Sequence, residues 1–173
     1  MKIVPADLRI LHYPAPALRC RAEPVEIDDT VRAVVARMLE LMNEAEGLGL
    51  AAPQVGLSWR LFVTRGKGEG EHDRVYINPR LLRLGGELAL HEEGCLSLPE
   101  ITAEIRRPST ATIAALDLEG QAFELHDDGG LARVWQHEHD HLEGILIIDK
   151  MSPMDRMATR RAVKELETAA IQG

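Results

Sequence analysis

The feature that most constrains this chain is the stretch WQHEHDHLEG, residues 135–144. It places His137 and His141 four residues apart, and in an α-helix this spacing puts both imidazoles on one face, one turn apart. Glu138 follows the first histidine and can reach a water molecule held by an ion between the two rings. This H-E-x-x-H pattern therefore predicts a helix that carries two metal ligands. His139 points elsewhere on such a helix, and we expect it to be solvated.

The alternative is an ordinary polar helix face on which the histidines coincide by chance. Leu131, Val134 and Trp135 lie just upstream, and these apolar side chains indicate a helix that is partly buried. An H-E-x-x-H match should arise by chance in fewer than roughly one chain in a hundred of this size. We therefore interpret the segment as a metal site.

A catalytic metal needs a third protein ligand and an open position for water. The pattern H-E-x-x-H-x-x-G-x-x-H would place a histidine at position 147, where this chain has Ile147. A glutamate from a later helix, Glu165 or Glu167, is one remaining candidate. Cys95 is another, because a thiolate is a soft ligand and the surrounding EEGCLSLPE is a short segment broken by glycine and proline. The spacing alone leaves these candidates open.

A second motif is GLGLAAPQVG, residues 47–56. Gly47, Gly49 and Ala52 satisfy G-x-G-x-x-A, but a dinucleotide-binding loop follows a strand and opens a helix. This stretch instead follows a predicted helix, and Pro53 obstructs a helix immediately after it. We therefore set a dinucleotide site aside and expect a tight segment whose glycines let the backbone approach a ligand closely.

Composition narrows the function classes. The formal net charge of −8 argues against a protein that binds nucleic acid by broad phosphate neutralisation. The N-terminal residues lack the apolar run of a secretory signal, and no stretch is apolar enough to span a bilayer. Two cysteines are too few for a disulfide framework. We expect a single catalytic domain over residues 1–173, in the reducing cytoplasm, without membrane association.

Hydrophobic spacing predicts an N-terminal helix over residues 31–46, and a capping pattern at Ser152 opens a last helix that runs to about residue 169. Short strands are predicted at residues 60–64, 74–79, 101–107, 109–118 and 121–126, with a hairpin turn at Glu119 and Gly120 and a polar surface loop at residues 65–73. Strands and helices do not alternate regularly, so the predicted class is α+β rather than a parallel α/β fold.

Three motifs taken together resemble peptide deformylase. The family carries G-x-G-L-A-A-x-Q, E-G-C-L-S and Q-H-E-x-D-H in this order, and here they stand at residues 47–54, 93–97 and 136–141. Similarity extends over residues 16–25 and 130–144, so it covers most of the chain. The resemblance implies mixed or antiparallel β-sheets packed around a central H-E-x-x-H helix, with an N-terminal and a C-terminal helix. It also selects Cys95 as the third ligand.

The activity implied by the resemblance is removal of the formyl group from the N-formylmethionine of newly made polypeptides, a hydrolase reaction of protein biosynthesis. Cys95, His137 and His141 would hold the metal, typically Fe²⁺, for which Ni²⁺, Co²⁺ or Zn²⁺ can substitute. A metal-activated hydroxide would attack the formyl carbon. Glu138 would take a proton from the water and later hand one to the departing amine.

Other residues receive roles from the resemblance alone. The Gln54 side chain and the Leu96 backbone N–H would donate hydrogen bonds to the negative oxygen that develops during attack. The substrate groove would be lined by Gly47, Gly49, Leu50, Glu93, Gly94, Gly130 and Val134, with Gly49 and Leu50 binding the substrate backbone as an added strand. Support behind the ligands would come from Glu93 and Gln136 and from a pair formed by Asp140 and Arg107.

Substrate preference beyond formylmethionine is left open by the chain's departures from the family. Relatives usually carry a bulky apolar residue at the position of Gly130, in the methionine pocket, and many carry Arg or Tyr at the position of Thr102. The expected partners are N-formylmethionyl peptides, and the C-terminal helix is a candidate contact for the ribosome. No nucleic-acid specificity is expected. The main alternative is a zincin-type endopeptidase whose third ligand is a late glutamate; a structural metal domain is disfavoured because only three ligands are well placed.

Overall fold

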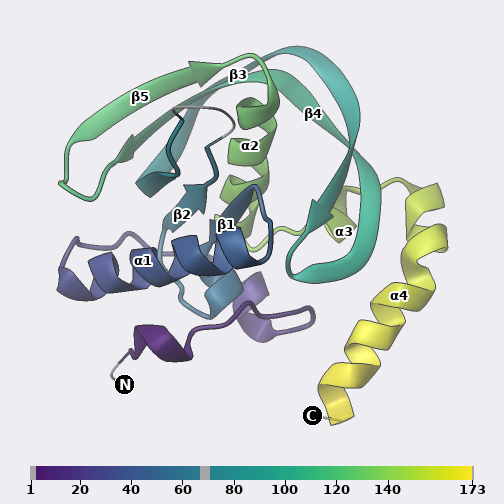
Figure 1. The fold of residues 1–173 in the computed structure, drawn as a ribbon. Coiled ribbons are helices and arrows are strands. Elements are labelled where there is room, and N and C mark those ends of the chain that lie inside the picture. Colours follow the sequence, from purple (N-terminus) through teal and green to yellow (C-terminus); the bar gives the residue numbers. More distant parts are fainter. Residues whose placement is uncertain (1–2, 67–70, 173) are drawn as a thin grey trace.

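The computed structural model describes residues 3–66 and 71–172. The helices are α1 (Asp29–Glu44), α2 (Gly130–Leu142), α3 (Ile147–Lys150) and α4 (Pro153–Gln172), with the 3-10 turns η1 (Pro5–Asp7), η2 (Pro16–Arg19) and η3 (Ala52–Val55). The strands are β1 (Gly49–Ala51), β2 (Leu61–Thr64), β3 (Arg74–Cys95), β4 (Leu98–Leu116) and β5 (Ala122–Asp127). Figure 1 shows α1 on one side of the strands, α2 in the middle of the molecule, and α4 at the far edge beside β4.

One antiparallel sheet contains all the named strands, in the order β1-β2-β3-β4-β5. The long β3–β4 hairpin curves over α2 (Figure 1), and α2 contacts all five strands. The α+β class and the central position of the H-E-x-x-H helix are therefore confirmed. The sheet is a single antiparallel one rather than mixed.

Helix α1 forms because its apolar residues recur on one face. Val31, Val34, Val35 and Met38 are fully or almost fully buried and pack against β1 and β2 in the first core cluster. The carboxylate of Asp28 caps the helix by accepting a hydrogen bond from the Val31 N–H at 2.8 Å. The cap makes α1 begin two residues before the predicted start, and the helix also ends two residues earlier than predicted.

Two further core clusters hold the later helices. Trp135 of α2 is buried against the strands, and its indole N–H donates to the Tyr76 hydroxyl at 2.9 Å. Helix α4 packs Val163 and Leu166 against the side of β4. The Ser152 hydroxyl accepts from the Asp155 N–H at 3.0 Å, which confirms the predicted cap. Helix α4 then runs to residue 172, beyond the predicted end.

The strands of the β3–β4 hairpin are longer than the sequence pattern predicts. Gly85 and Gly86 have the composition of a turn, but the structure places them at a bulge, with a register shift before Leu88 and a φ of 74° at Gly86. Pro108 is likewise inside β4, where a proline removes a backbone donor. It is tolerated because β5 pairs with β4 only from Ala111 onward, so β4 has one strand neighbour at that point.

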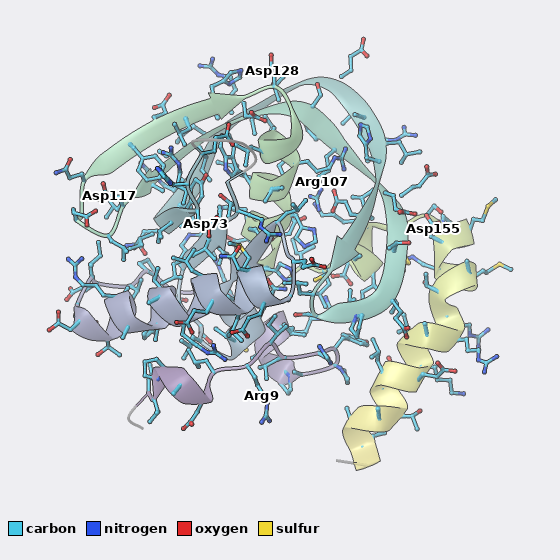
Figure 2. The ribbon with its side chains drawn as sticks, in the orientation of Figure 1. Arg9, Asp73, Arg107, Asp117, Asp128 and Asp155 are labelled. Carbon is cyan, nitrogen blue, oxygen red and sulfur yellow. The ribbon has the colours of Figure 1, made fainter. Side chains whose placement is uncertain are left out.

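The predicted hairpin turn at Glu119 and Gly120 is confirmed. Gly120 has a φ of 78°, and the Asp117 carboxylate accepts from the N–H groups of Glu119 and Gln121 at 3.0 and 2.8 Å. Figure 2 shows Asp117, Asp128 and Asp155 at the periphery and Arg107 in the interior. Of the predicted surface loop, residues 67–70 lie outside the described residues. None of the described helices is long and apolar enough to cross a membrane.

Candidate active site

Three potential metal ligands meet where α2 passes the end of β3. One donor atom from each of Cys95, His137 and His141 lies within 4.8 Å of the others. The His141 Nε2 is 3.2 Å from the His137 Nε2 and 3.4 Å from the Cys95 Sγ. One thiolate and two imidazoles form a donor set typical of Zn²⁺ and of other divalent first-row metals, and three protein ligands leave a fourth position for water or substrate.

Glu165 and Glu167, the other candidates for the third ligand, do not contact the group of Cys95, His137 and His141. Glu165 accepts a hydrogen bond from Arg161 along the outside of α4, at 2.9 Å. Glu167 accepts one from the Tyr13 hydroxyl at 3.1 Å. The alternative with a glutamate as third ligand, and with it the zincin-type arrangement, is therefore wrong.

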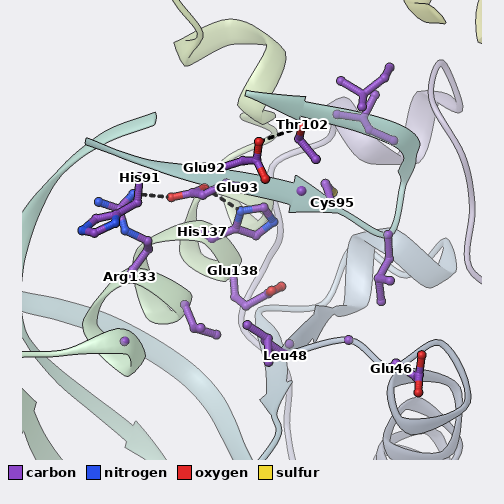
Figure 3. Close-up of a pocket in the computed structure, with 18 of the residues that line it drawn as sticks. Glu46, Leu48, His91, Glu92, Glu93, Cys95, Thr102, Arg133, His137 and Glu138 are labelled. Atoms are coloured by element: carbon purple, nitrogen blue, oxygen red, sulfur yellow. Dashed lines mark hydrogen bonds and ion pairs between the residues drawn. The ribbon is translucent and has the colours of Figure 1, made fainter. Parts of the chain in front are cut away.

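The His137 ring is oriented from behind by Glu93. Its Nδ1 lies 3.0 Å from the Glu93 Oε2 (Figure 3). This contact leaves the Nε2 on the side of Cys95 and His141. Arg107 donates to both oxygens of Glu93, at 2.6 and 3.0 Å. Burial acts to raise the pKa of Glu93, but the hydrogen bonds from His137 and Arg107 outweigh it and hold that pKa far below its usual value. Glu93 is therefore a buried, charged carboxylate.

The electrostatics of the cluster favour a cation. Burial acts to lower the pKa of His137, but hydrogen bonds with Cys95 and Glu93 and the nearby charge of Glu138 raise it to about 10. Burial, and then the charge of His137, lowers the pKa of His141 well below its ordinary value. The surroundings thus stabilise positive charge at His137 while His141 stays neutral, the form in which an imidazole binds metal. A bound cation would satisfy the same negative surroundings once His137 has lost its proton.

Glu138 is almost fully buried beside the cluster, and its Oε2 has no hydrogen-bond partner among the described residues. Burial raises its pKa to about 7. The carboxylate reaches this place because position 49 is a glycine: a Cβ on Gly49 would lie 2.5 Å from the Glu138 Oε1. A carboxyl group with this pKa can both take and give a proton near neutral pH.

Gln54, in η3, presents its amide donor to the cluster. Its Oε1 accepts from the Ala51 N–H at 2.9 Å, so the amide is held in one orientation. Its Nε2 then donates to the Ser97 hydroxyl at 3.2 Å and lies 3.6 Å from the Cys95 Sγ. The Leu96 side chain lies close to Gly47, where an added Cβ would come within 2.7 Å of the Leu96 Cδ1.

A cavity of about 870 Å³ opens onto His137 and Glu138. Its lining includes most of the expected groove residues, namely Gly47, Gly49, Glu93, Gly94, Gly130 and Val134. Leu50 differs from expectation: its side chain is fully buried in the core with α1, because an apolar side chain gains more there than in an open groove. Leu48 lines the cavity instead.

Comparison with known proteins agrees with this geometry. Residues 7–157 match the sequence model of the family described as polypeptide deformylase. A peptide deformylase of Chromohalobacter salexigens is 46% identical over 152 residues, which cover 87% of this chain and 89% of the relative. The chain belongs to the polypeptide deformylase family. A peptide deformylase of Acinetobacter baumannii is 44% identical over 162 residues, covering 93% of this chain and 92% of that protein.

Solved deformylase structures share the whole fold. A plant peptide deformylase superposes with a TM-score of 0.92 at 34% identity, covering 99% of this chain and 95% of that one. A Plasmodium falciparum peptide deformylase gives a TM-score of 0.88 at 38% identity, covering 93% and 96% of the two chains. The deformylase resemblance drawn from three short motifs is therefore confirmed over nearly the full length.

The predictions for His139 and Gln136 of α2 need correction or refinement in this deformylase-family chain. His139 is half-buried rather than solvated, because strands surround the helix. Its Nε2 lies 3.0 Å from the Arg60 Nη2. Burial, and then the charge of Arg60, lowers the pKa of His139. Gln136 donates to the carbonyls of Pro108 and Ala132, at 2.9 and 3.0 Å, so it supports the helix against β4 rather than a ligand directly.

The predicted pair of Arg107 and Asp140 is present, with a distance of 2.7 Å between Nη1 and Oδ2. Lys150 also contacts the Asp140 carboxylate, at 3.0 Å. Arg133 was not predicted as a site residue from the sequence. It lies on α2, as His137 and His141 do, and donates a hydrogen bond to Glu93. The sequence could have indicated this position, because Arg133 precedes His137 by four residues and so lies on the same helix face.

Proposed function

We propose that this chain removes the formyl group from N-formylmethionine at the start of newly made polypeptides and releases formate. The observation that carries the proposal is the group of Cys95, His137 and His141 beside the buried Glu138, at a cavity, in a chain of the deformylase family. Residues 1–173 then act as one catalytic unit. The cytoplasm, where new polypeptides appear, is the proposed location.

The proposed metal is Fe²⁺, with Ni²⁺, Co²⁺ or Zn²⁺ as substitutes. The thiolate of Cys95 and the Nε2 atoms of His137 and His141 would hold it. The bound ion would supply Lewis acidity and would activate a water molecule at neutral pH. Elemental analysis of protein purified without air identifies the ion that is loaded.

The protein's own groups carry the proton and stabilise the charge. Glu138 takes a proton from the attacking water and passes one to the amine that departs, which its pKa of about 7 permits in both directions. Gln54 and the Leu96 backbone N–H donate to the negative oxygen that forms on the substrate. The Ala51 contact holds the Gln54 amide in place before substrate arrives, so little reorganisation is needed.

The substrate backbone binds along the edge of β1. This strand is the first of the sheet, so its edge away from β2 has no strand neighbour among the described residues. Gly47 and Gly49 line the cavity beside that edge, and Gly94 lines it from β3. An extended peptide can add to such an edge through main-chain hydrogen bonds. The formyl group then reaches the metal ligands while the methionine side chain lies toward Val134 and Gly130.

The test is release of formate from formyl-Met-Ala by the purified protein. We expect release with the metal loaded, loss of release after a chelator removes the metal, and recovery when the metal is restored. The unformylated dipeptide serves as the control for background formate. A folded, metal-loaded protein that releases no formate would overturn the proposal.

Replacing Gln54 with alanine should lower kcat by about 10²–10³-fold, the usual effect of removing one donor to a developing oxyanion. The metal affinity should change much less, because Gln54 is not in the ligand group. Steady-state kinetics and metal titration on one preparation separate the two effects. Gln121→Ala, in the exposed β4–β5 turn, is the matched control. Unchanged turnover in Gln54→Ala would remove this residue from the mechanism.

Gly130 leaves one wall of the cavity without a side chain. Methionine should remain a substrate, while bulkier first residues should be penalised little. Gly130→Leu should raise the ratio of kcat/KM for formyl-Met-Ala over formyl-Phe-Ala by about tenfold, since a change of one methylene in an apolar pocket gives roughly 10–200-fold discrimination. Ala158→Leu, on the exposed face of α4, is the control. An unchanged ratio would mean that Arg133, which lines the same cavity, already fills the space.

The proposed partner beyond the substrate is the ribosome, through α4. The exposed basic side chains of this helix are Arg156, Arg160, Arg161 and Lys164. Basic groups on a helix that packs mainly on β4 suit an anionic surface. Co-sedimentation with ribosomes at two salt concentrations measures this contact.

A further inference from the structure

We propose that Arg133 is a positioning residue of the metal site and that it acts through Glu93 on His137 and Cys95. The inference rests on the proposed function only in requiring that Cys95, His137 and His141 bind a metal. It concerns a side chain that is not itself a ligand, and the contacts that carry it join three elements of the fold.

Arg133 reaches from α2 to both strands of the long hairpin. Its Nη1 donates to the Glu93 Oε1 at 2.7 Å and to the Ile105 carbonyl at 3.0 Å. Its Nη2 donates to the Ala89 carbonyl at 2.7 Å. The side chain is only 17% exposed, and its contact with Glu93 is visible in Figure 3. A planar guanidinium reaches these acceptors in fixed directions from two separate nitrogen atoms, whereas an ammonium group has a single nitrogen whose donors rotate freely.

Glu93 connects Arg133 to two of the proposed metal ligands, His137 and Cys95. One of its oxygens faces the His137 Nδ1 at 3.0 Å, and the residue lies two positions before Cys95 at the end of β3. Arg133 and His137 are one turn apart on α2. Arg133 and His137 of α2 therefore both contact Glu93 of β3. The Glu93 carboxylate orients the His137 ring, and its contact with Arg133 holds the end of β3 that carries Cys95.

Arg107 alone does not replace Arg133 in this loop. The Arg107 guanidinium is shared between Glu93 and Asp140, whereas Arg133 supplies a second donor to the Glu93 Oε1. The edge of β3 that faces away from β4 pairs with β2 only at residues 74–77, and no described strand continues that pairing toward Cys95. Arg133 thus fastens a stretch of β3 that is paired on one side only.

The experiment is a titration of the metal-free protein with Co²⁺, used as a spectroscopic probe. Arg133→Gln should raise the dissociation constant for Co²⁺ by roughly 10–100-fold, the usual effect of losing a contact behind a ligand. It should also alter the visible absorption of the Co²⁺-saturated protein, because the His137 ring and the Cys95 thiolate are held less firmly. Arg133→Lys should fall between the two, since it keeps the charge without the guanidinium geometry. Arg32→Gln makes the same charge change at an exposed position of α1 and should leave both quantities unchanged.

A double-mutant cycle with Glu93→Gln distinguishes a positioning role of Arg133 from a purely structural one. If Arg133 acts through Glu93, adding Arg133→Gln to Glu93→Gln should weaken Co²⁺ binding no further. The same addition should still lower the melting temperature, because the contacts with the Ala89 and Ile105 carbonyls are lost in either background. An equal loss of Co²⁺ affinity in both backgrounds overturns the proposal, and so does an Arg133→Gln protein that binds Co²⁺ as well as the parent.

If Glu93→Gln no longer binds Co²⁺, or if Arg133→Gln does not fold, the Co²⁺ titration of Arg133→Lys tests the proposal instead. An affinity below that of the parent, with an altered Co²⁺ spectrum, supports the positioning role. Parental affinity and spectrum in Arg133→Lys overturn it. Every one of these readouts is taken without substrate, so a failure of formate release would contradict the proposed function and leave this test intact.

Discussion

Replacing Glu138 with glutamine should leave the metal bound and lower the rate of deformylation by about 10²–10⁴-fold, the contribution typical of a general acid–base group. The substitution keeps the shape of the side chain and does not touch Cys95, His137 or His141. It removes the only carboxyl group among the described residues that is both buried and without a partner beside this cluster. Metal analysis and formate release on one preparation test both halves of the prediction.

Glu165→Gln is the matched control, because it makes the same chemical change at an exposed position of α4. Its activity and metal content should equal those of the parent. The melting temperature of Glu138→Gln should also be measured, since a buried amide without partners is unfavourable by about 1–3 kcal/mol. An active Glu138→Gln protein would show that another group carries the proton.

Replacing Cys95 with alanine should abolish both metal binding and deformylation. The loss of affinity should exceed the roughly 10–100-fold effect of removing a contact behind a ligand, because a direct ligand is deleted. The remaining histidines, His137 and His141, come from one helix and leave the ion held from one side only. Metal content after purification, together with formate release at added Fe²⁺, measures the effect.

Cys20→Ala is the natural control for this substitution. Cys20 is the other cysteine, it is exposed, and its sulfur donates a hydrogen bond to the Pro16 carbonyl at 3.5 Å. Neither metal content nor activity should change in Cys20→Ala. A Cys95→Ala protein that retains both would mean that a side chain outside the observed group completes the site.

The predictions about Arg133, Glu138 and Cys95 share a physical cause. Two of the proposed ligands and the proposed proton carrier come from α2, whereas the third proposed ligand comes from β3, so the proposed catalysis depends on how firmly the helix and the strand are joined. Glu93 and its two arginines make this junction with charged hydrogen bonds that are largely shielded from water. Removing one member of such a network leaves a buried charge with fewer partners, which is costlier than losing a surface ion pair.

Features that depend on neighbours close along the chain were predictable from the sequence. The spacing of His137 and His141 required one helix face, the apolar repeat of α1 required a buried stripe, and Ser152 supplied the cap of α4. Each follows from the 3.6-residue repeat of a helix or from a cap within the first turn. The family resemblance then supplied what spacing left open, above all the choice of Cys95.

Contacts between distant segments were decided by the tertiary structure alone. Between the register shifts at Gly85–Leu88 and at Gly94–Cys95, Glu93 pairs with Ala103, and a shift of one residue would turn the side chains of this segment of β3 to the opposite face. That register brings Glu93 between Arg107 and Arg133. The same packing buries Leu50 and partly buries His139, contrary to expectation. A sequence pattern records which side chains are apolar or charged, but the faces they meet depend on how α2 and the sheet enclose each other.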